Sequence, residues 1–389
     1  MSALSRFLDP PRLRVLETDE EERRATWLEL FFDLVFVVAV AELGEVLSHD
    51  VTLGGFLRSL ALFVPVWWAW AGFTFYANRF DTDDLVYRLL IFVAMFAVAA
   101  LATTVPDAFE GGSAGFAVSY VCIRLVLLVL YARAIRSVDQ GRRLAMFYFS
   151  MFGLAVLVWL ASLAVPEPAR YVLWGLALAI ELSAPLFGWR LLPDAPVDPR
   201  HLPERFGLLT IIVLGESVFA VVLGVRDVSW ALSPAFAAAG GFLAAAAIWW
   251  IYSGFLDSSV GEGLRRGLTL TYVHFFVYSG IAALGVGVKL VILEAGGDES
   301  YADVAWVFCA GLALCMAALA AIQLMTPPEL FDADVWLRLG TAVIALVALP
   351  LSFILPALVV VWFLTALLVG QVVLELARHE RHTAPSGSG

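Results

Sequence analysis

Long, unbroken apolar runs are the feature that most constrains how this chain can fold. The run from Leu144 to Val165 is typical, because no charged residue interrupts it. A helix needs about 20 mainly apolar residues to cross the hydrocarbon core of a bilayer. Membrane-spanning β-strands are about half as long and alternate polar with apolar residues. The runs therefore predict membrane-spanning helices and not a β-barrel.

Runs of this kind recur along the whole chain and predict about 12 transmembrane helices. The expected ranges are 27–47, 53–76, 86–105, 115–136, 144–165, 170–190, 205–224, 232–256, 268–293, 302–325, 338–354 and 356–376. The last two ranges form one apolar stretch with Pro350 and Pro356 near its middle. Because proline interrupts helix hydrogen bonding, we interpret this stretch as a tight helical hairpin. The predicted fold class is an all-α integral membrane protein.

The composition supports this class and argues against others. Hydrophobic residues make up 61% of the 389 residues and charged residues only 15%, whereas soluble domains average about 45–50% and about 25%. Acids outnumber bases, 35 to 24, and no long basic run could neutralise phosphates, so we expect no nucleic-acid partner. Membrane lipid and an unidentified ion or small molecule are the expected partners, and homo-oligomerisation stays open.

The sequence offers little for chemistry at a catalytic centre. No phosphate-binding loop, zinc-protease motif or nucleophile elbow occurs in a suitable context. The three cysteines, Cys122, Cys309 and Cys315, lie inside apolar runs without the spacing of a zinc site. We therefore predict no catalytic residues, no metal site, no cofactor and no enzyme activity.

The distribution of arginine predicts the orientation in the membrane. Arginines gather in the N-terminal segment, in every second connection and after the last span. Since positively charged segments remain on the cytoplasmic side, both termini are expected there. Residues 1–24 have no apolar core of a signal peptide and form a cytoplasmic segment in this interpretation. Residues 381–389 are expected to be a disordered tail.

Two segments share the pattern W-W-x-aromatic-small-G-F, Trp67–Phe73 and Trp249–Phe255. Each lies in a span that follows another span carrying acids. An even number of helices in each unit would give both units the same orientation, so we predict a 6+6 parallel repeat with halves 25–195 and 196–380. Chance is the alternative in a chain with 13 Trp and 28 Phe. We expect the aromatic residues of the first segment to serve packing more than an ion pathway.

Ionisable side chains inside the spans are costly, about 2.5–3.5 kcal/mol each on insertion scales, so each is a functional candidate. The candidates for transport or ion binding are Glu29, Asp33, Glu42, Glu181, Glu204, Glu216 and His274. The candidates for charge pairing are Arg124, Arg205 and Lys289. A buried arginine requires a carboxylate partner, and for Arg124 the alternatives are Glu181, Asp33 and Glu216.

Asp33 and Glu216 are the strongest site candidates. Glu216 lies near the middle of its span and follows Gly215, which permits close helix approach. We predict that both carboxylates face the protein interior, close to a shared cavity or to a basic partner, and that Arg124 and His274 are the nearby basic groups. The alternative for each acid is a structural hydrogen bond between helices. Lys289, at the outer end of its span, is expected to snorkel to the interface.

The segment Trp27–Val37 reads W-L-E-L-F-F-D-L-V-F-V. It resembles the E-L-F-F-D-L-V-F-V signature of the bacterial low temperature requirement protein A family. Glu204-Arg205, followed by Leu214-Gly215-Glu216, resembles that family's second signature. The similarity covers residues from about 25 to about 380 and implies a multi-pass protein of the bacterial inner membrane. The family is named for a growth requirement in the cold, and the resemblance implies no substrate.

The leading hypothesis is a secondary transporter or permease of two six-helix halves. Asp33 and Glu216 would carry a coupling proton or bind a cation near the interface between the halves. One alternative is a cation channel with six-helix repeats: Phe32-Asp33 is similar to the first helix of a potassium channel family, although that family has Ser before the Asp. The other alternative is a membrane stress or assembly factor that transports nothing.

Overall fold

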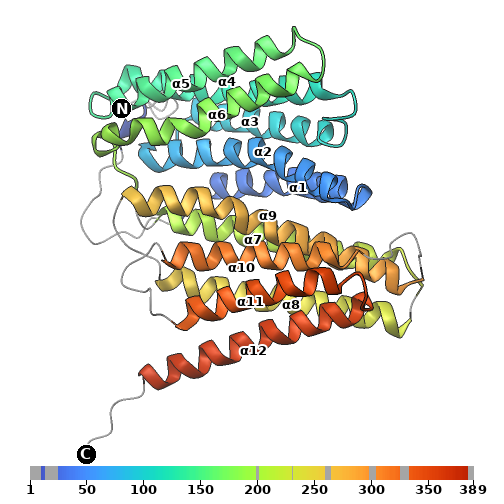
Figure 1. Cartoon of the computed structure of the whole chain (residues 1–389). Coiled ribbons are helices and arrows are strands. Elements are labelled where there is room, and N and C mark those ends of the chain that lie inside the picture. The colour runs from blue at the N-terminus through green and yellow to red at the C-terminus, as the bar shows by residue number, and fades with distance from the viewer. Residues whose placement is uncertain are drawn as a thin grey trace, which may run out of the picture. The chain divides into compact units, whose positions relative to one another are not determined.

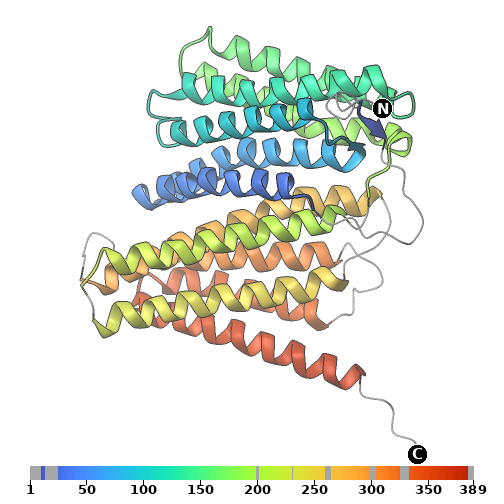
Figure 2. The same cartoon turned by 180° about the vertical axis from the view of Figure 1, so that it is seen from behind.

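The computed structural model describes residues 10–13, 25–198, 201–229, 231–258, 264–297, 304–324 and 333–383. Within these ranges the chain is almost entirely helical (Figures 1 and 2). The helices are α1 (Trp27–His49), α2 (Leu53–Arg79), α3 (Leu85–Thr104), α4 (Ser113–Ser137), α5 (Arg142–Ser162), α6 (Ala169–Phe187), α7 (His201–Arg226), α8 (Leu232–Ser258), α9 (Leu264–Ala295), α10 (Trp306–Leu324), α11 (Ala333–Leu351) and α12 (Ala357–Thr383). A 3₁₀ helix, η2 (Gly188–Asp194), and a two-stranded antiparallel pair, β1 (Arg12–Leu13) with β2 (Phe80–Asp81), complete the described structure.

Eleven of these helices are long and apolar enough to cross a membrane. The helix α1 is outside this set, although it is 23 residues long, because it carries Glu29, Asp33, Glu42 and Glu45. The prediction of a multi-pass, all-helical membrane protein with about 12 helices is thus confirmed. The sides on which the termini lie stay a prediction. Most of the N-terminal segment 1–24 and residues 384–389 of the tail lie outside the described residues.

The interpretation of the last apolar stretch as a hairpin is confirmed. Pro350 lies in the last turn of α11, and α12 begins directly after Pro356. Polar contacts join the two helices at three levels: Asp334 with Arg378 (3.5 Å), Arg338 with Glu375 (3.7 Å) and Thr341 with Gln371 (2.7 Å). Positions three or four residues apart share a helix face, so these contacts fix the register of two antiparallel helices.

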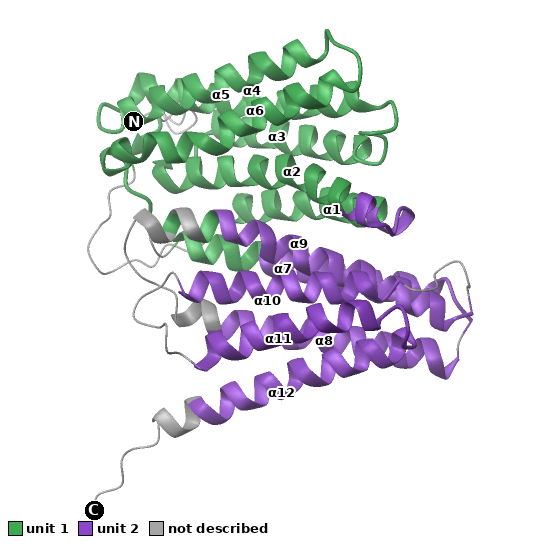
Figure 3. Cartoon of the chain, in the orientation of Figure 1, with its two compact units in different colours: residues 1–46, 57–209, 262–271 green, residues 47–56, 210–261, 272–389 purple. Residues whose placement is uncertain are grey.

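The chain divides into two compact units (Figure 3). Unit 1 contains residues 1–46, 57–209 and 262–271, and unit 2 contains residues 47–56, 210–261 and 272–389. In unit 1, α3 packs against α4, α4 against α5, and α5 against α6, as helices joined by short connections usually do. In unit 2, α10 packs against α11, α11 against α12, and α12 against α8.

The interior of unit 1 is rich in aromatic side chains. Trp67 and Trp70 of α2 stack with ring centroids 5.1 Å apart, and Phe206 meets the edge of Trp70 at 5.3 Å. Trp67, Trp68 and Trp70 are each at most 4% exposed. These side chains therefore pack within the unit, as expected for the first W-W segment. The duplication of the two halves stays a prediction.

Candidate functional site

The start of α1 places two acids on one face of the helix. Thr26 precedes the helix, and its Oγ1 accepts the backbone N–H of Glu29 at 3.2 Å. The Glu29 carboxylate in turn accepts the backbone N–H of Thr26 at 2.8 Å. This reciprocal pair is a capping box, which satisfies two N–H groups that a helix start leaves free. Asp33 follows Glu29 by one turn and lies on the same face.

The start of α7 is held by residues from its own preceding loop and from α2. The Asp198 carboxylate accepts the backbone N–H of His201 at 3.2 Å. Asn78, in the last turn of α2, accepts the backbone N–H of Asp198 at 2.7 Å. Arg205 follows His201 by four residues and therefore lies on the same face of α7.

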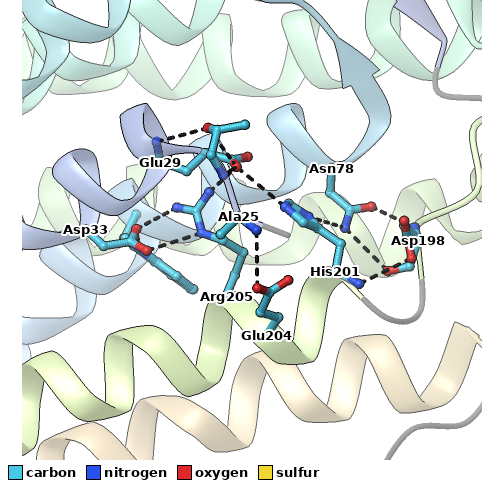
Figure 4. Close-up of polar contacts among 10 residues, drawn as sticks. Ala25, Glu29, Asp33, Asn78, Asp198, His201, Glu204 and Arg205 are labelled. Atoms are coloured by element: carbon cyan, nitrogen blue, oxygen red, sulfur yellow. Dashed lines mark hydrogen bonds and ion pairs between the residues drawn. The ribbon is translucent and has the colours of Figure 1, made fainter. Parts of the chain in front are cut away.

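These helix starts bring Arg205 between the two acids of α1 (Figure 4). Its Nη2 and Nε lie 2.5 and 3.2 Å from the two oxygens of Asp33, and its Nη1 lies 3.1 Å from Glu29 Oε1. Trp70 donates its Nε1–H to Asp33 Oδ1 at 2.7 Å. A two-pronged contact of guanidinium with carboxylate is among the strongest polar contacts in proteins. We call Glu29, Asp33, Trp70, His201 and Arg205 the Arg205 cluster.

The Arg205 cluster is buried and its charges do not balance. Asp33 is 0% exposed and Arg205 is 1% exposed. Two carboxylates share one guanidinium, so with a neutral His201 these side chains carry one negative charge in excess. A small pocket of about 10 Å³ borders Glu29 and Arg205, which is room for roughly one water molecule.

A second buried arginine lies among α4 and α6. Arg124 Nη2 is 2.5 Å from Glu181 Oε2, and both side chains are 0% exposed. The Tyr120 hydroxyl accepts from Arg124 at 2.9 and 2.6 Å and lies 2.6 Å from Glu181 Oε2, to which it donates. One carboxylate balances one guanidinium in this Arg124 pair. The structure thus selects Glu181 from the predicted alternatives for Arg124.

The structure distributes the other candidates over separate places. His274 of α9 is buried, with its Nε2 3.1 Å from the Tyr252 hydroxyl. Glu216 is half-buried in the part of α7 that belongs to unit 2, within electrostatic range of Lys289. Glu204 accepts the backbone N–H of Ala25 at 3.2 Å. The half-buried Glu42 lies farther along α1.

One expectation about Asp33 is wrong. Its basic partner is Arg205, whereas Arg124 pairs with Glu181 and His274 contacts Tyr252. The reason is that the start of α7 packs against the start of α1 within unit 1, a tertiary contact that helix spacing does not reveal. Asp33 and Glu216 belong to different units, and their shared cavity stays a prediction.

Sequence reasoning missed His201, Asn78 and Trp70 as members of this site. The expected span 205–224 begins after the polar first turn of α7 and therefore excludes His201. The spacing of His201 and Arg205, four residues apart in H-L-P-E-R, was the available signal. Two ionisable groups at this spacing share a helix face.

The helices and the buried cluster define a multi-pass α-helical membrane protein with ionisable groups in its interior. The model of the bacterial low temperature requirement A protein family matches residues 24–373, which include the starts of both α1 and α7. The chain belongs to this family. An uncharacterized protein of Rhizobium meliloti (strain 1021) is 30% identical over 300 residues, which cover 71% of each chain.

Proposed function

We propose that the protein is a secondary transporter or permease of the bacterial cytoplasmic membrane, and that the Arg205 cluster binds a coupling proton or a cation. The observation that carries this proposal is the excess carboxylate: Glu29 and Asp33 face a single guanidinium. A buried charge without a counter-charge costs several kcal/mol. A proton or a small cation bound here removes that cost, which is the property a coupling site needs.

Binding at the cluster can be linked to movement. Arg205 divides its donors between Asp33 and Glu29, so neutralising one acid leaves the guanidinium held by the other alone. A ligand shifts a conformational equilibrium only when it binds one state better than the other. A proton or cation that satisfies the excess carboxylate would therefore favour whichever state of the cluster binds it more tightly. The half-buried Glu216 is the proposed second acid of the pathway.

A specific observation also favours a second candidate, a membrane factor that transports nothing. Both oxygens of Asp33 already have donors, from Arg205 and Trp70. Such complete pairing is what a purely structural contact between helices requires. In that case the cluster fixes the packing of α1 and α7, and its charges stabilise a single state.

Flux through proteoliposomes distinguishes these functions. The full chain is tested against a panel of ions and metabolites, with and without a pH gradient, as wild type, Asp33→Asn and Glu216→Gln. Asp139→Asn is the matched control, since this acid is 93% exposed. For a transporter, Asp33→Asn and Glu216→Gln abolish coupled flux while the protein still folds, and the control is unaffected.

The other outcomes count against the proposal. For a channel, conductance persists in both variants with altered selectivity. For a structural factor, wild type moves none of the solutes in the panel, and the substitutions change thermal stability alone. Reporter fusions test the proposed orientation: those after residues 110, 227 and 298 report outside, and those after residues 140, 200 and 380 report inside. An outside signal at residue 380 contradicts it.

A further inference from the structure

The contact between Asn78 and His201 fixes the position of a hydrogen atom. Both side chains are buried, at 0% and 1% exposure. Asn78 Oδ1 accepts the backbone N–H of Asp198 at 2.7 Å, which identifies that atom as the oxygen because a backbone N–H can only donate. The Asn78 amide nitrogen is consequently the atom that lies 3.2 Å from His201 Nδ1.

The protonation state of His201 follows from this orientation. An amide nitrogen of asparagine has hydrogens to donate and accepts none, so His201 Nδ1 must be the acceptor and carries no hydrogen. The imidazole is therefore neutral, with its hydrogen on Nε2. Nε2 lies 3.5 Å from Glu29 Oε2, on the side of the Arg205 cluster, without a hydrogen bond to it.

We infer that His201 is the proton-binding group of the Arg205 cluster and that Asn78 holds it in its neutral form; the inference rests on the proposed function for its role in coupling. Adding a proton to Nδ1 sets two N–H donors against each other and breaks the contact with Asn78. The imidazolium then lies beside Glu29 and supplies the positive charge that the cluster lacks. One proton thus changes the excess charge from one negative to none.

The charged groups around His201 come from several elements. Glu29 of α1 and Asp198 before α7 favour the imidazolium, while Arg205, one turn along α7, opposes it. Arg79, next to Asn78 on α2, is directed elsewhere, to the Ala195 carbonyl at 3.3 Å. Tyr87 of α3 lines the small pocket beside Glu29 and Arg205. Charged groups of both signs therefore surround the ring.

Loss of the contact with Asn78 also reaches the backbone. Asn78 binds the Asp198 N–H at 2.7 Å and the Asp198 carbonyl at 3.4 Å, so it holds the chain just before α7. A proton on His201 removes one of the amide's partners and pushes the amide away from the ring. Proton uptake by His201 should therefore displace the backbone where the end of α2 contacts the start of α7.

Nuclear magnetic resonance of ¹⁵N-histidine in the full-length protein in detergent tests the inference directly. The chain has five histidines, and His201→Gln identifies the signals of His201. At neutral pH the ring should show hydrogen on Nε2 only, and acidification should add the second proton together with a simultaneous change in the Asn78 side-chain amide. Hydrogen on Nδ1, double protonation already at neutral pH, or no change across the titration overturns the inference.

Asn78→Asp provides a sharper second measurement, because it replaces the donor opposite Nδ1 by an acceptor. In this variant His201 should be doubly protonated at a pH where the wild-type ring is neutral. The signals of His274, which contacts Tyr252 in unit 2, should be unaffected and serve as the internal control. Neither measurement depends on transport. A protein that transports nothing would refute the proposed function, whereas the protonation of His201 would still be decided by these two measurements.

Discussion

Two of the buried arginines of unit 1, Arg124 and Arg205, differ in how their charge is balanced. Arg124 and Arg205 are both almost fully buried, and each binds a carboxylate at 2.5 Å. Among the residues that the structure describes, Arg124 forms an ion pair with Glu181 alone, whereas Arg205 is shared between Asp33 and Glu29. A balanced pair has nothing to gain from a further ion, whereas a cluster with an extra carboxylate does. Burial alone therefore does not identify a candidate binding site. The balance between buried positive and negative charges distinguishes the two places.

The helix α2 contributes to both the Arg205 cluster and the surroundings of the Arg124 pair. Trp70 donates to Asp33, and a Cβ added at Gly72 would lie 2.8 Å from Arg124 Nη1. These positions are two residues apart and therefore point to nearly opposite faces of the helix. The W-W-x-W-x-G segment thus supplies a donor on one face and space for a guanidinium on the other.

The largest expected effect comes from breaking the Arg124 pair. Arg124→Met leaves Glu181 buried without its counter-charge and should lower the free energy of unfolding by about 3–5 kcal/mol. Thermal unfolding in detergent measures it. Replacing both residues by apolar side chains, as in Arg124→Met with Glu181→Leu, should recover most of the loss. If the double variant is no more stable than the single one, the pair is not the balanced structural contact described.

Matched neutralisation of one acid at each place gives the next effect. Glu181→Gln removes the acid that pairs with Arg124 at 2.5 Å and should cost about 3 kcal/mol. Asp33→Asn leaves Arg205 balanced by Glu29, and the new amide oxygen can still accept from Trp70, so the cost should stay near 1 kcal/mol. The comparison of unfolding temperatures for the two variants decides this. Equal losses would mean that the Arg205 cluster has no excess charge to lose.

The sequence predicts where the helices lie far better than it predicts which buried charges contact each other. Apolar runs of fixed length predict each helix, and Pro350 and Pro356 predict the turn of the last hairpin, because these are local properties. The pairing of Arg124 with a carboxylate is also predictable, since burial of one charge demands another. Which carboxylate it meets, and that Arg205 meets Asp33, depend on tertiary packing between helices far apart in the chain.

Polar helix ends are the second limit of sequence reasoning. The first turn of α7 contains His201 and Glu204 and reads as a connection by hydropathy, yet it forms part of the helix and of the site. Asn78 resembles an ordinary polar residue at a helix end. Its orientation toward His201 comes from a backbone N–H of Asp198, which no side-chain pattern encodes.

The two W-W segments allow a smaller test of the surroundings of Arg124. An Ala Cβ at position 72 would lie 2.8 Å from Arg124 Nη1 and 2.9 Å from Leu127 Cδ2. Because the guanidinium is held by Tyr120 and Glu181, Gly72→Ala should cost about 1–3 kcal/mol.

Gly254, at the matching position of the second segment, is the control. A Cβ there meets nothing within 4 Å, and the neighbouring Trp249 and Trp250 are each 45% exposed. Gly254→Ala should therefore be neutral or stabilise by up to about 1 kcal/mol through helix propensity. Losses of similar size at both glycines, seen as shifts in unfolding temperature, would contradict the packing of Gly72 against Arg124.

The smallest expected effect separates the charge of Glu29 from its role at the start of α1. Glu29→Gln removes the charge, keeps an acceptor for the Thr26 N–H, and leaves Arg205 balanced by Asp33, so stability should change by no more than about 0.5 kcal/mol. Glu29→Ala also removes the capping contact and should cost about 1 kcal/mol. Unfolding temperatures of the two variants provide the measurement. A large loss in Glu29→Gln would show that the cluster needs both acids for folding, and its second carboxylate would then be structural, like Glu181 in the Arg124 pair.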